Sequence, residues 1–576
     1  MLKLFRFLNP YRLLIVGVVI LVFFQSMADL YLPTLMADIV NTGIVKGDTN
    51  YIFKTGGFML LVAAGGVICA VVAGFWSSKI AMGFGKILRG KIFTHVSSFS
   101  LHEFDKLGTP SLITRNTNDI TQLQMVTMIM LRMMIMAPIM CIGGIIMAIS
   151  KDPQLSWVLV LVVPILAGAI IIITGKTIPL FKAMQVKIDK LNLVLREGLI
   201  GIRVIRAFNR IEHEKKRFYD ANLDLTNNAI RVNQIMAVMM PIMMLVMNFT
   251  TIAIIWFGSI GVGQGITSIG NMMAFLQYAM QIMFSLMMAT MMFVMLPRAQ
   301  ASATRLNEVL ATAPEIKDPK QVKQTGNQKG YIEFKEVTFR YHGAEEPALE
   351  NISFCAGPGE VTAIIGGTGS GKTTLINLIP RFYDVDGGSI LVDGMDIREM
   401  SQENLRAKIG LVPQKAILFT GTIADNIRYG KDDATDEEVR QAAETAQATE
   451  FISAMKDGFD SVIAQGGTNI SGGQKQRLAI ARALIRRPEI FIFDDSFSAL
   501  DFKTDARLRA ALKKETAEVT VFIVAQRVST VMDADRIIVL DEGRVAGIGK
   551  HKELYQTCEV YREIVSSQLS EEELLA

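Results

Sequence analysis

Residues 366–373 carry the strongest chemical pattern in the chain, the run Gly-Gly-Thr-Gly-Ser-Gly-Lys-Thr. An apolar run, Val361–Ile365, precedes it, and a helix-like run, Thr374–Ile379, follows it. Glycines let backbone N–H groups converge on phosphate oxygens, and a lysine and a helix start add positive charge. The pattern predicts a phosphate-binding loop made of Gly366, Gly367, Thr368, Gly369, Ser370, Gly371, Lys372, Thr373 and Thr374.

A second apolar run, Ile490–Phe493, ends in two aspartates, Asp494 and Asp495. A buried strand that delivers a carboxylate to a phosphate loop usually supplies the protein ligand of Mg²⁺. Asp494 is therefore the predicted Mg²⁺ ligand, together with the hydroxyl of Thr373.

A serine-glycine segment lies between these two patterns and opens a helix-like stretch: Ser471, Gly472, Gly473 and Gln474. A serine and backbone amides at a helix start form a second anion cradle. Combined with the phosphate loop and the run Ser-Ala-Leu-Asp at 498–501, this segment makes the chain resemble ATP-binding cassette exporters of the half-transporter type. The resemblance covers nearly the whole chain. It implies ATP and Mg²⁺ as ligands, and a serine-glycine segment that contacts the γ-phosphate of ATP held by the other subunit.

The resemblance assigns further roles. It implies that Tyr341 stacks on adenine and that Gln414 senses Mg²⁺ and the membrane domain. Ser498 and Asp501 match the family's D-loop. In the loops, Thr109–Asp119 and Gly201–Phe208 match the two coupling helices that dock on nucleotide-binding domains.

Two positions depart from the family pattern. The catalytic carboxylate after the Mg²⁺ ligand is normally glutamate, and here it is Asp495, one methylene shorter. The switch histidine is replaced by Gln526, which carries no titratable proton. A base displaced by about 1 Å loses about a hundredfold in rate. The cassette is therefore expected to bind Mg-ATP well and to hydrolyse it poorly. Gln465, where the exporter family commonly has glutamate, is a further difference.

These departures predict a heterodimer with a related half-transporter that carries the glutamate and the histidine. The predicted function is export of hydrophobic or amphiphilic, multidrug-type compounds. A slow homodimeric exporter, a lipid flippase subunit and a peptide exporter subunit are alternatives on the same fold. A regulatory or channel-like subunit that uses ATP binding without transport is the alternative from another class.

The elements that must position these residues fall into two parts, because the composition changes near residue 315. Before it lie six apolar runs, each near or above the ~20 residues that span a bilayer. A soluble helical core rarely supplies six such runs. They lie at about 13–40, 55–80, 125–149, 154–176, 236–262 and 271–297.

The two long loops and the N-terminus are basic, which places both termini on the cytoplasmic side of the cell (inner or plasma) membrane. After residue 330, strand-like and helical runs alternate and predict an α/β domain around a largely parallel sheet. The expected organisation is a transmembrane domain at 1–312, a linker at 313–330 and an ATP-binding cassette domain at 331–576.

Bulk composition excludes other classes. The chain has 576 residues, is 50% hydrophobic and carries a net charge of only +4, so no nucleic-acid-binding surface is indicated. Its four cysteines are scattered without metal-ligand spacing.

The apolar part is rich in methionine, and 24 of the 33 methionines lie within residues 121–300. Methionine adapts to varied apolar ligands but also packs helices and faces lipid, so both readings stay open. Polar residues are costly inside a bilayer and usually face an interior. The predicted contacts of a substrate cavity are Arg132, Asn248, Gln277, Tyr278 and Gln281.

Overall fold

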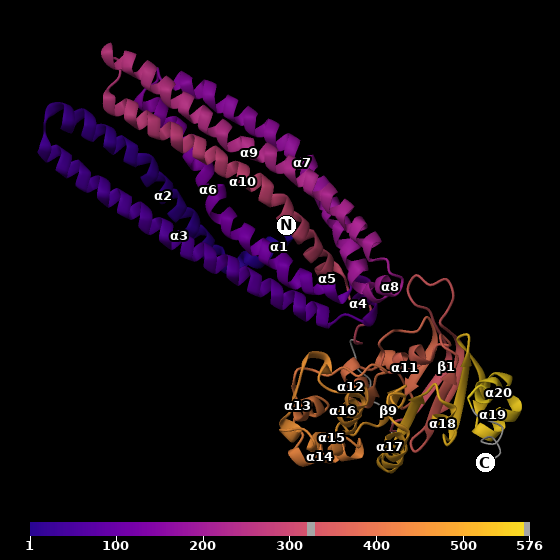
Figure 1. Cartoon of the computed structure of the whole chain (residues 1–576). Coiled ribbons are helices and arrows are strands. Elements are labelled where there is room, and N and C mark those ends of the chain that lie inside the picture. The colour runs from indigo at the N-terminus through magenta and orange to yellow at the C-terminus, as the bar shows by residue number, and fades with distance from the viewer. Residues whose placement is uncertain (320–328, 569–576) are drawn as a thin grey trace. The chain divides into compact units, whose positions relative to one another are not determined.

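The computed structural model describes residues 1–319 and 329–568 (Figure 1). It divides into two compact units, one of residues 1–97 and 109–312 and one of residues 98–108 and 313–576. Of the predicted linker, residues 320–328 lie outside the described part of the chain.

Six long helices build the first unit, and each is long and apolar enough to cross a membrane, with mean hydropathy between 1.9 and 2.8 in its most apolar stretch. The six predicted spans are confirmed, and each falls on one of these longer helical spans, with the fourth starting at Ser156 and not at 154. Most residues of the two basic loops extend these same helices. The six are α2 (Arg12–Asp38), α3 (Thr49–Ser97), α6 (Ile120–Lys151), α7 (Ser156–Ile200), α9 (Ile211–Gly263) and α10 (Ile269–Ala311).

Short segments connect them. A helix and a 3₁₀ turn precede α2, and π-helical turns follow α2 and precede α6. These segments are α1 (Leu2–Phe5), Arg6–Tyr11, Ile39–Ile44, α5 (Thr109–Thr114), Arg115–Asp119 and α8 (Ile202–Ala207).

The separate helix of the first long loop does not lie where the resemblance implies it. Thr109–Asp119 is not a separate helix, because α5 and its π turn run into α6 as one span. The separate short helix is α4 (Leu101–Leu107), which belongs to the second unit. Gly108, with a φ of 74°, ends α4, and Pro110 fits the first turn of the next helix. For the second loop, α8 lies within the predicted 201–208.

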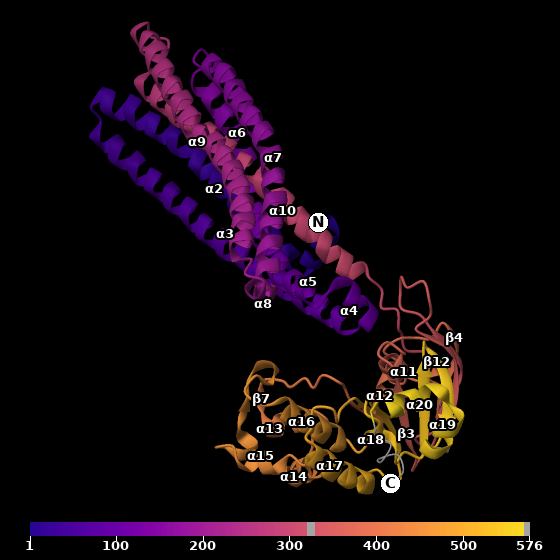
Figure 2. The same ribbon diagram turned by 45° about the vertical axis from the view of Figure 1, so that its right-hand side comes forward.

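Neighbouring long helices pack in pairs, α2 along α3, α6 along α10 and α7 along α9, as both views show (Figures 1 and 2). A partly buried ion-pair network ties the last turns of α10 to the start of α6. Asp119 is 2% exposed and accepts hydrogen bonds from Arg305, whose Nε lies 2.7 Å away, and from the Ser302 hydroxyl at 2.9 Å. Arg115 pairs with Glu308 at 2.8 Å and donates to the Arg305 carbonyl at 3.0 Å.

This network predicts a large effect of Asp119→Ala. The substitution leaves Arg305 and Ser302 without their carboxylate acceptor, which costs about 2–3 kcal/mol when the surviving charge is half-buried. Thermal unfolding of the detergent-solubilised chain should show a clear fall in Tm. The control is Lys215→Ala, which removes an exposed pair with Glu212 and should leave Tm within about a degree. Equal shifts for the two variants would contradict the structural role of the network.

The second unit contains the cassette, and its α/β pattern is confirmed. A six-stranded sheet has the order β12-β11-β3-β10-β9-β6, with only β12 antiparallel to its neighbour. Its strands are β3 (Val361–Gly366), β6 (Ile409–Val412), β9 (Ile490–Asp494), β10 (Thr520–Val524), β11 (Arg536–Asp541) and β12 (Arg544–Gly549).

A four-stranded antiparallel sheet of order β2-β1-β4-β5 packs beside it, and a two-stranded ribbon joins β7 to β8. Their strands are β1 (Ile332–Phe339), β2 (Leu349–Ala356), β4 (Gly387–Val392), β5 (Met395–Asp396), β7 (Gly421–Thr422) and β8 (Val462–Ile463).

Helices cover the sheets in groups: α13–α16 lie together, and α19 and α20 lie beside one another (Figures 1 and 2). The helices are α11 (Lys372–Leu378), α12 (Gln402–Ala407), α13 (Ile423–Arg428), α14 (Asp436–Thr445), α15 (Thr449–Ser453), α16 (Gly472–Leu484), α17 (Phe502–Glu515), α18 (Val528–Val531), α19 (His551–Thr557) and α20 (Glu559–Ser566). The core strand β9 is buried at every residue, which explains its continuous apolar run.

Candidate functional site

The phosphate loop connects β3 to α11, in the strand, loop and helix order that the sequence predicts. Gly371 has a φ of 95°, and a Cβ there would lie 2.7 Å from a methyl carbon of Leu349, so only glycine fits. Lys372 Nζ donates to the carbonyls of Gly366 and Gly367 at 2.8 and 2.6 Å. Burial lowers the pKa of Lys372, and the charges of Asp495 and Asp494 oppose that shift. The lysine is thus held over a loop shaped to receive an anion.

Thr373 and Asp494 come together beside the loop. The Thr373 hydroxyl donates to Asp494 Oδ1 at 3.3 Å, and Asp494, at the end of β9, is only 6% exposed. Burial raises the pKa of Asp494, although the hydrogen bond from Thr373 works the other way. A hydroxyl and a buried carboxylate in contact are the oxygen donors that Mg²⁺ takes next to a nucleotide. The residues present therefore fit the expected ion.

Asp495 lies at the centre of a small polar cluster. Its Oδ2 accepts a hydrogen bond from Gln526 Nε2 at 3.1 Å and another from Gln414 Nε2 at 3.3 Å. Its φ of 46° is left-handed, a conformation that aspartate tolerates better than most residues. The sequence predicted all three residues for this site, and the structure brings them together. Their contact with one another was not predicted.

Tyr341 lies two residues after β1 and next to α11. Its hydroxyl is 2.9 Å from Thr374 Oγ1, and its ring packs edge-on against Phe339 and Tyr383, with centroid distances of 5.0 and 5.5 Å. The side chain remains 39% exposed. An aromatic ring that is fixed at its rim and open beside a phosphate loop suits stacking on a base.

The serine-glycine segment Ser471–Gln474 begins α16. Ser471 Oγ accepts from the Gln474 backbone N–H at 3.3 Å, and Gln474 Oε1 accepts from the Ser471 N–H at 2.9 Å, so the two residues form a capping box. Gly473 lies against the D-loop, because a Cβ there would be 3.1 Å from the Ala499 carbonyl oxygen.

The two D-loop residues have local partners. The Ser498 hydroxyl donates to the Asp495 carbonyl at 2.9 Å, and Asp501 caps α17 by accepting from the Thr504 N–H at 3.0 Å. That hydrogen bond lowers the pKa of Asp501. The D-loop therefore links the Asp495 cluster to the start of α16.

The short helix α4 packs on the cassette beside Tyr341. Glu103, 4% exposed, accepts hydrogen bonds from the Ser100 N–H at 2.6 Å, the Ser100 hydroxyl at 2.7 Å and the Glu315 N–H at 3.1 Å. The His102 and His342 rings are 4.7 Å apart. Burial raises the pKa of Tyr383 to about 12, and the nearby Asp105 charge adds to that effect. Sequence reasoning missed Glu103, because a glutamate in a basic loop looks like any solvated charge.

The predicted substrate-cavity residues do not all meet. Gln277 and Gln281 line a cavity of about 320 Å³ between α2, α6 and α10. Tyr278 is fully buried and donates to the Leu30 carbonyl at 2.9 Å, so its role is to hold α10 against α2. Arg132 and Asn248 are exposed and do not line this cavity. The cavity also contains Asp29, which the sequence analysis passed over.

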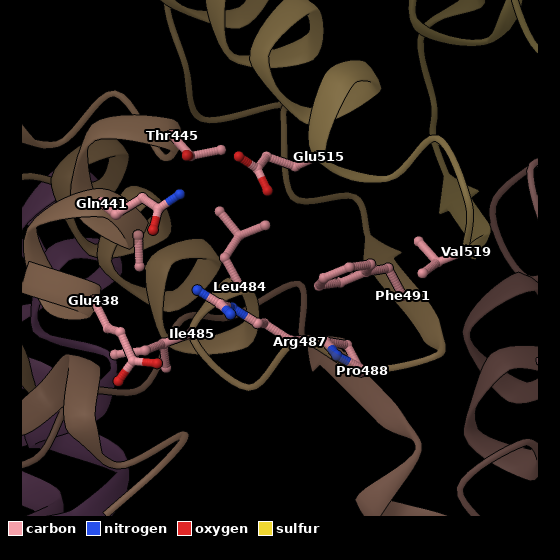
Figure 3. A pocket seen from close by; sticks show the side chains of 11 residues that line it. Glu438, Gln441, Thr445, Leu484, Ile485, Arg487, Pro488, Phe491, Glu515 and Val519 are labelled. Carbon is pink, nitrogen blue, oxygen red and sulfur yellow. The ribbon is translucent and has the colours of Figure 1, made fainter. Parts of the chain in front are cut away.

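Another cavity of about 370 Å³ lies in the cassette (Figure 3). Its walls come from α14, the residues after α16, β9 and the end of α17, and include Glu438, Arg487 and Glu515. None of its lining residues is among the predicted ATP-binding residues, so it is separate from the phosphate site.

Comparison with known proteins decides the family. Residues 14–286 match the family described as the ABC transporter transmembrane region, and residues 349–498 match the ABC transporter family. An uncharacterized ABC transporter ATP-binding protein of Mycobacterium tuberculosis is 44% identical over 565 residues, which span 97% of this chain and 97% of that protein. The chain belongs to the ABC transporter family.

Two further likenesses describe the kind of ABC transporter. An ATP-dependent lipid A-core flippase of Vibrio vulnificus is 30% identical over 579 residues, covering 99% of this chain and 97% of that protein. The solved structure of a bacterial Atm1-family ABC exporter with ATP bound has a TM-score of 0.81 at 25% identity and covers 97% of this chain and 99% of that one. The molecule is a multi-pass membrane protein with an exporter fold, and its cassette couples ATP to transport.

Removal of the loop lysine tests the phosphate site. In Lys372→Ala the buried positive charge that faces the loop is lost, so binding of a fluorescent ATP analogue should weaken at least about 30-fold. Lys456→Ala, on the cassette surface, is the matched control and should bind like the wild type. Unchanged binding by the Lys372 variant would place the nucleotide elsewhere.

Glu103 predicts a pH-dependent attachment of α4. Hydrogen bonds from Ser100 and Glu315 outweigh burial and hold the pKa of Glu103 below the usual 4.5. Its stabilisation is therefore present above that value and lost as pH falls through the lowered pKa. Amide exchange at 100–107 and 315, corrected for intrinsic rates, should rise in this acidic range in the wild type.

In Glu103→Ala the same amides should exchange faster at neutral pH, by a protection loss of about 1–3 kcal/mol. Lys106→Ala on the same helix is the control, since that side chain is exposed. Protection in Glu103→Ala that equals the wild type would show that the carboxylate does not hold the segment.

Proposed function

We propose that this chain is one subunit of a heterodimeric ATP-driven exporter of hydrophobic or amphiphilic compounds, and that it binds ATP at a site poorly equipped for hydrolysis. One observation carries the proposal: the carboxylate proposed as the general base, Asp495, is one methylene shorter than glutamate, and one of its oxygens accepts hydrogen bonds from two amides. In this site those donors are Gln414 and Gln526. A base acts only within hydrogen-bond reach of the attacking water.

The proposed ATP-binding half of the site has all of its predicted residues. The phosphate loop at 366–373 and Lys372 hold the phosphates, and the Tyr341 ring stacks on adenine. Thr373, Asp494 and Gln414 hold Mg²⁺, which when bound neutralises charge on the β- and γ-phosphates. Gln526 can donate a hydrogen bond to a phosphate oxygen but cannot exchange a proton with it.

The exposed capping box at Ser471–Gln474 supports the proposal that this chain works as part of a heterodimer. Its helix start presents backbone N–H groups outward, and within the described residues no hydrogen bond joins it to the chain's own phosphate loop. ABC exporters work as dimers, so this cradle acts on the nucleotide of the partner subunit. The partner carries the glutamate and the histidine that this chain lacks, which makes the partner's site the hydrolytic one.

Substitution of the two carboxylates in the assembled pair tests this division. Changing the partner's catalytic glutamate to glutamine should lower ATPase activity at least about 100-fold, because general-base catalysis is worth that much. Asp495→Asn in this chain should leave at least about half of the activity, since it is not the working base. Substantial ATPase activity after the partner substitution would refute the heterodimer with one working site.

Reversion toward the family pattern gives a second test. Because Asp495 and Gln526 contact each other, Asp495→Glu and Gln526→His should each raise ATPase activity only slightly alone. The double variant should raise it by a factor larger than the product of the two single factors. The measurement is ATPase activity of the pair with the partner's glutamate already changed to glutamine. A double-variant gain in ATPase activity equal to the product of the two single gains would show that the two positions act separately.

Lipid is the second candidate substrate, because the chain is 30% identical to a lipid A-core flippase along nearly its whole length. Flux in proteoliposomes separates the two substrates. ATP-dependent accumulation of an amphiphilic dye supports the exporter, whereas transfer of a labelled lipid between leaflets without dye uptake supports the flippase.

A further inference from the structure

The cavity of about 320 Å³ in the membrane-spanning unit contains an acidic residue, Asp29 of α2. It lies in a helical span, Lys3–Ile44, whose most apolar stretch has a mean hydropathy of 2.3. Within the described residues its carboxylate has no hydrogen bond and no ion pair. An ionisable group inside a span is costly and marks a functional position when nothing in the protein neutralises it. Because an unpaired carboxylate inside a span is energetically costly, Asp29 calls for a functional explanation.

A second polar residue, Gln281 of α10, lines the same cavity. It donates its Nε2 to the Asp29 backbone carbonyl at 3.0 Å, which ties α10 to α2 at this point. Its Oε1 is buried and has no hydrogen-bond partner. Ser285, one turn further along α10, donates its hydroxyl to the Ile282 carbonyl. The polar part of the cavity therefore offers acceptors, so a complementary ligand group is a hydrogen-bond donor with positive charge.

No cation of the protein fills this position in the described structure. Lys151 lies 3.9 Å from Asp38, and Arg305 pairs with Asp119. Arg132 points toward α3, where its Nη1 would be 3.7 Å from a Cβ at Gly74. No lysine or arginine lines the cavity. A neutralising charge must therefore come from outside the chain.

The rest of the wall is apolar and polarizable. Met136 and Met140 of α6 and Phe284 and Met288 of α10 line it. Thioethers adapt to apolar bodies of varied shape, and an aromatic face attracts a cation. A Ca²⁺ ion takes six to eight oxygen ligands, and Asp29 is the one carboxylate among the residues that line this cavity. The surroundings suit an organic ammonium group with a hydrophobic body.

We propose that this cavity is a binding site for amphiphilic amines, in which the Asp29 carboxylate holds the ammonium group and the methionine and phenylalanine side chains hold the apolar body. Its use for transport rests on the proposed export function. Binding itself does not, because the site is formed by α2, α6 and α10 of this one chain.

A pair of probes that differ only in charge tests the site. Dansylcadaverine carries a primary ammonium, and its N-acetyl derivative is neutral with the same fluorophore and chain. The full-length chain is placed in nanodiscs of phosphatidylcholine, whose surface has no net charge, and binding is read from dansyl fluorescence against empty nanodiscs. The wild type should bind the ammonium probe at least about tenfold more tightly than the acetylated one.

Three substitutions place the charge preference at Asp29. Asp29→Asn should weaken binding of the ammonium probe about tenfold and change binding of the neutral probe by less than about twofold, so the preference for the charged probe disappears. Asp29→Glu should keep part of this preference. Asp38→Asn is the matched control, an aspartate of the same helix outside the cavity, and should keep all of it. ATP-analogue binding by each variant confirms that the chain is folded.

The outcomes separate this site from the export proposal. A wild type that binds both probes equally, or neither, overturns the site, as does a preference that survives Asp29→Asn. ATP-dependent uptake into inside-out vesicles that contain the chain and its partner is measured with the same probes. Asp29-dependent binding without uptake would keep the site and refute export, whereas equal uptake of both probes that ignores Asp29→Asn would keep export and refute the site.

Discussion

Parallel strands end at one edge of a sheet, and the cassette depends on that constraint. β3 leads into the phosphate loop, β9 ends in Asp494, and Gln414 and Gln526 follow β6 and β10 by two residues each. These four strands are neighbours in the order β3-β10-β9-β6, so segments far apart in sequence must meet where the phosphates bind. The hydrogen bonds between Thr373 and Asp494, and from both glutamines to Asp495, follow from this one arrangement.

The serine-glycine segment does not belong to this sheet edge, and within the described residues no hydrogen bond joins it to the phosphate loop. α16 begins at the exposed capping box of Ser471 and Gln474, on the group of helices α13–α16 that packs beside β6 and β9. A helix start binds an anion only where its N–H groups point. The capping box satisfies the Ser471 and Gln474 amides within the chain and keeps the turn rigid, so the cradle is preformed before any partner arrives. In the proposed dimer, assembly brings two preformed halves together, which has a smaller entropic cost than ordering them on contact.

Much of this could be predicted because the patterns are local. A glycine loop must follow a strand and precede a helix, and about twenty apolar residues must cross a bilayer as a helix, so the phosphate loop and the six spans were read directly from the sequence. Contacts between distant segments could not be read in this way. Tyr278 looked like a cavity residue, but its hydroxyl reaches the Leu30 carbonyl. Asp29 belongs to no sequence motif, so its place in the cavity could not be predicted. Glu103 and α4 could not be recognised either, because the helix ends at Gly108 and no change in composition marks that end.

The contact between Asp495 and Gln526 also changes how the departures from the family are weighed. Viewed in sequence they are 31 residues apart and count as two separate losses of catalytic groups. In the structure the Gln526 amide donates to Asp495 Oδ2 at 3.1 Å, so they form one hydrogen-bonded pair. A shorter carboxylate leaves room for an amide donor, and in the described residues the Gln526 amide takes that place. Each residue is the hydrogen-bond partner of the other, so under the proposed function the two departures act as one coupled pair and not as two independent changes.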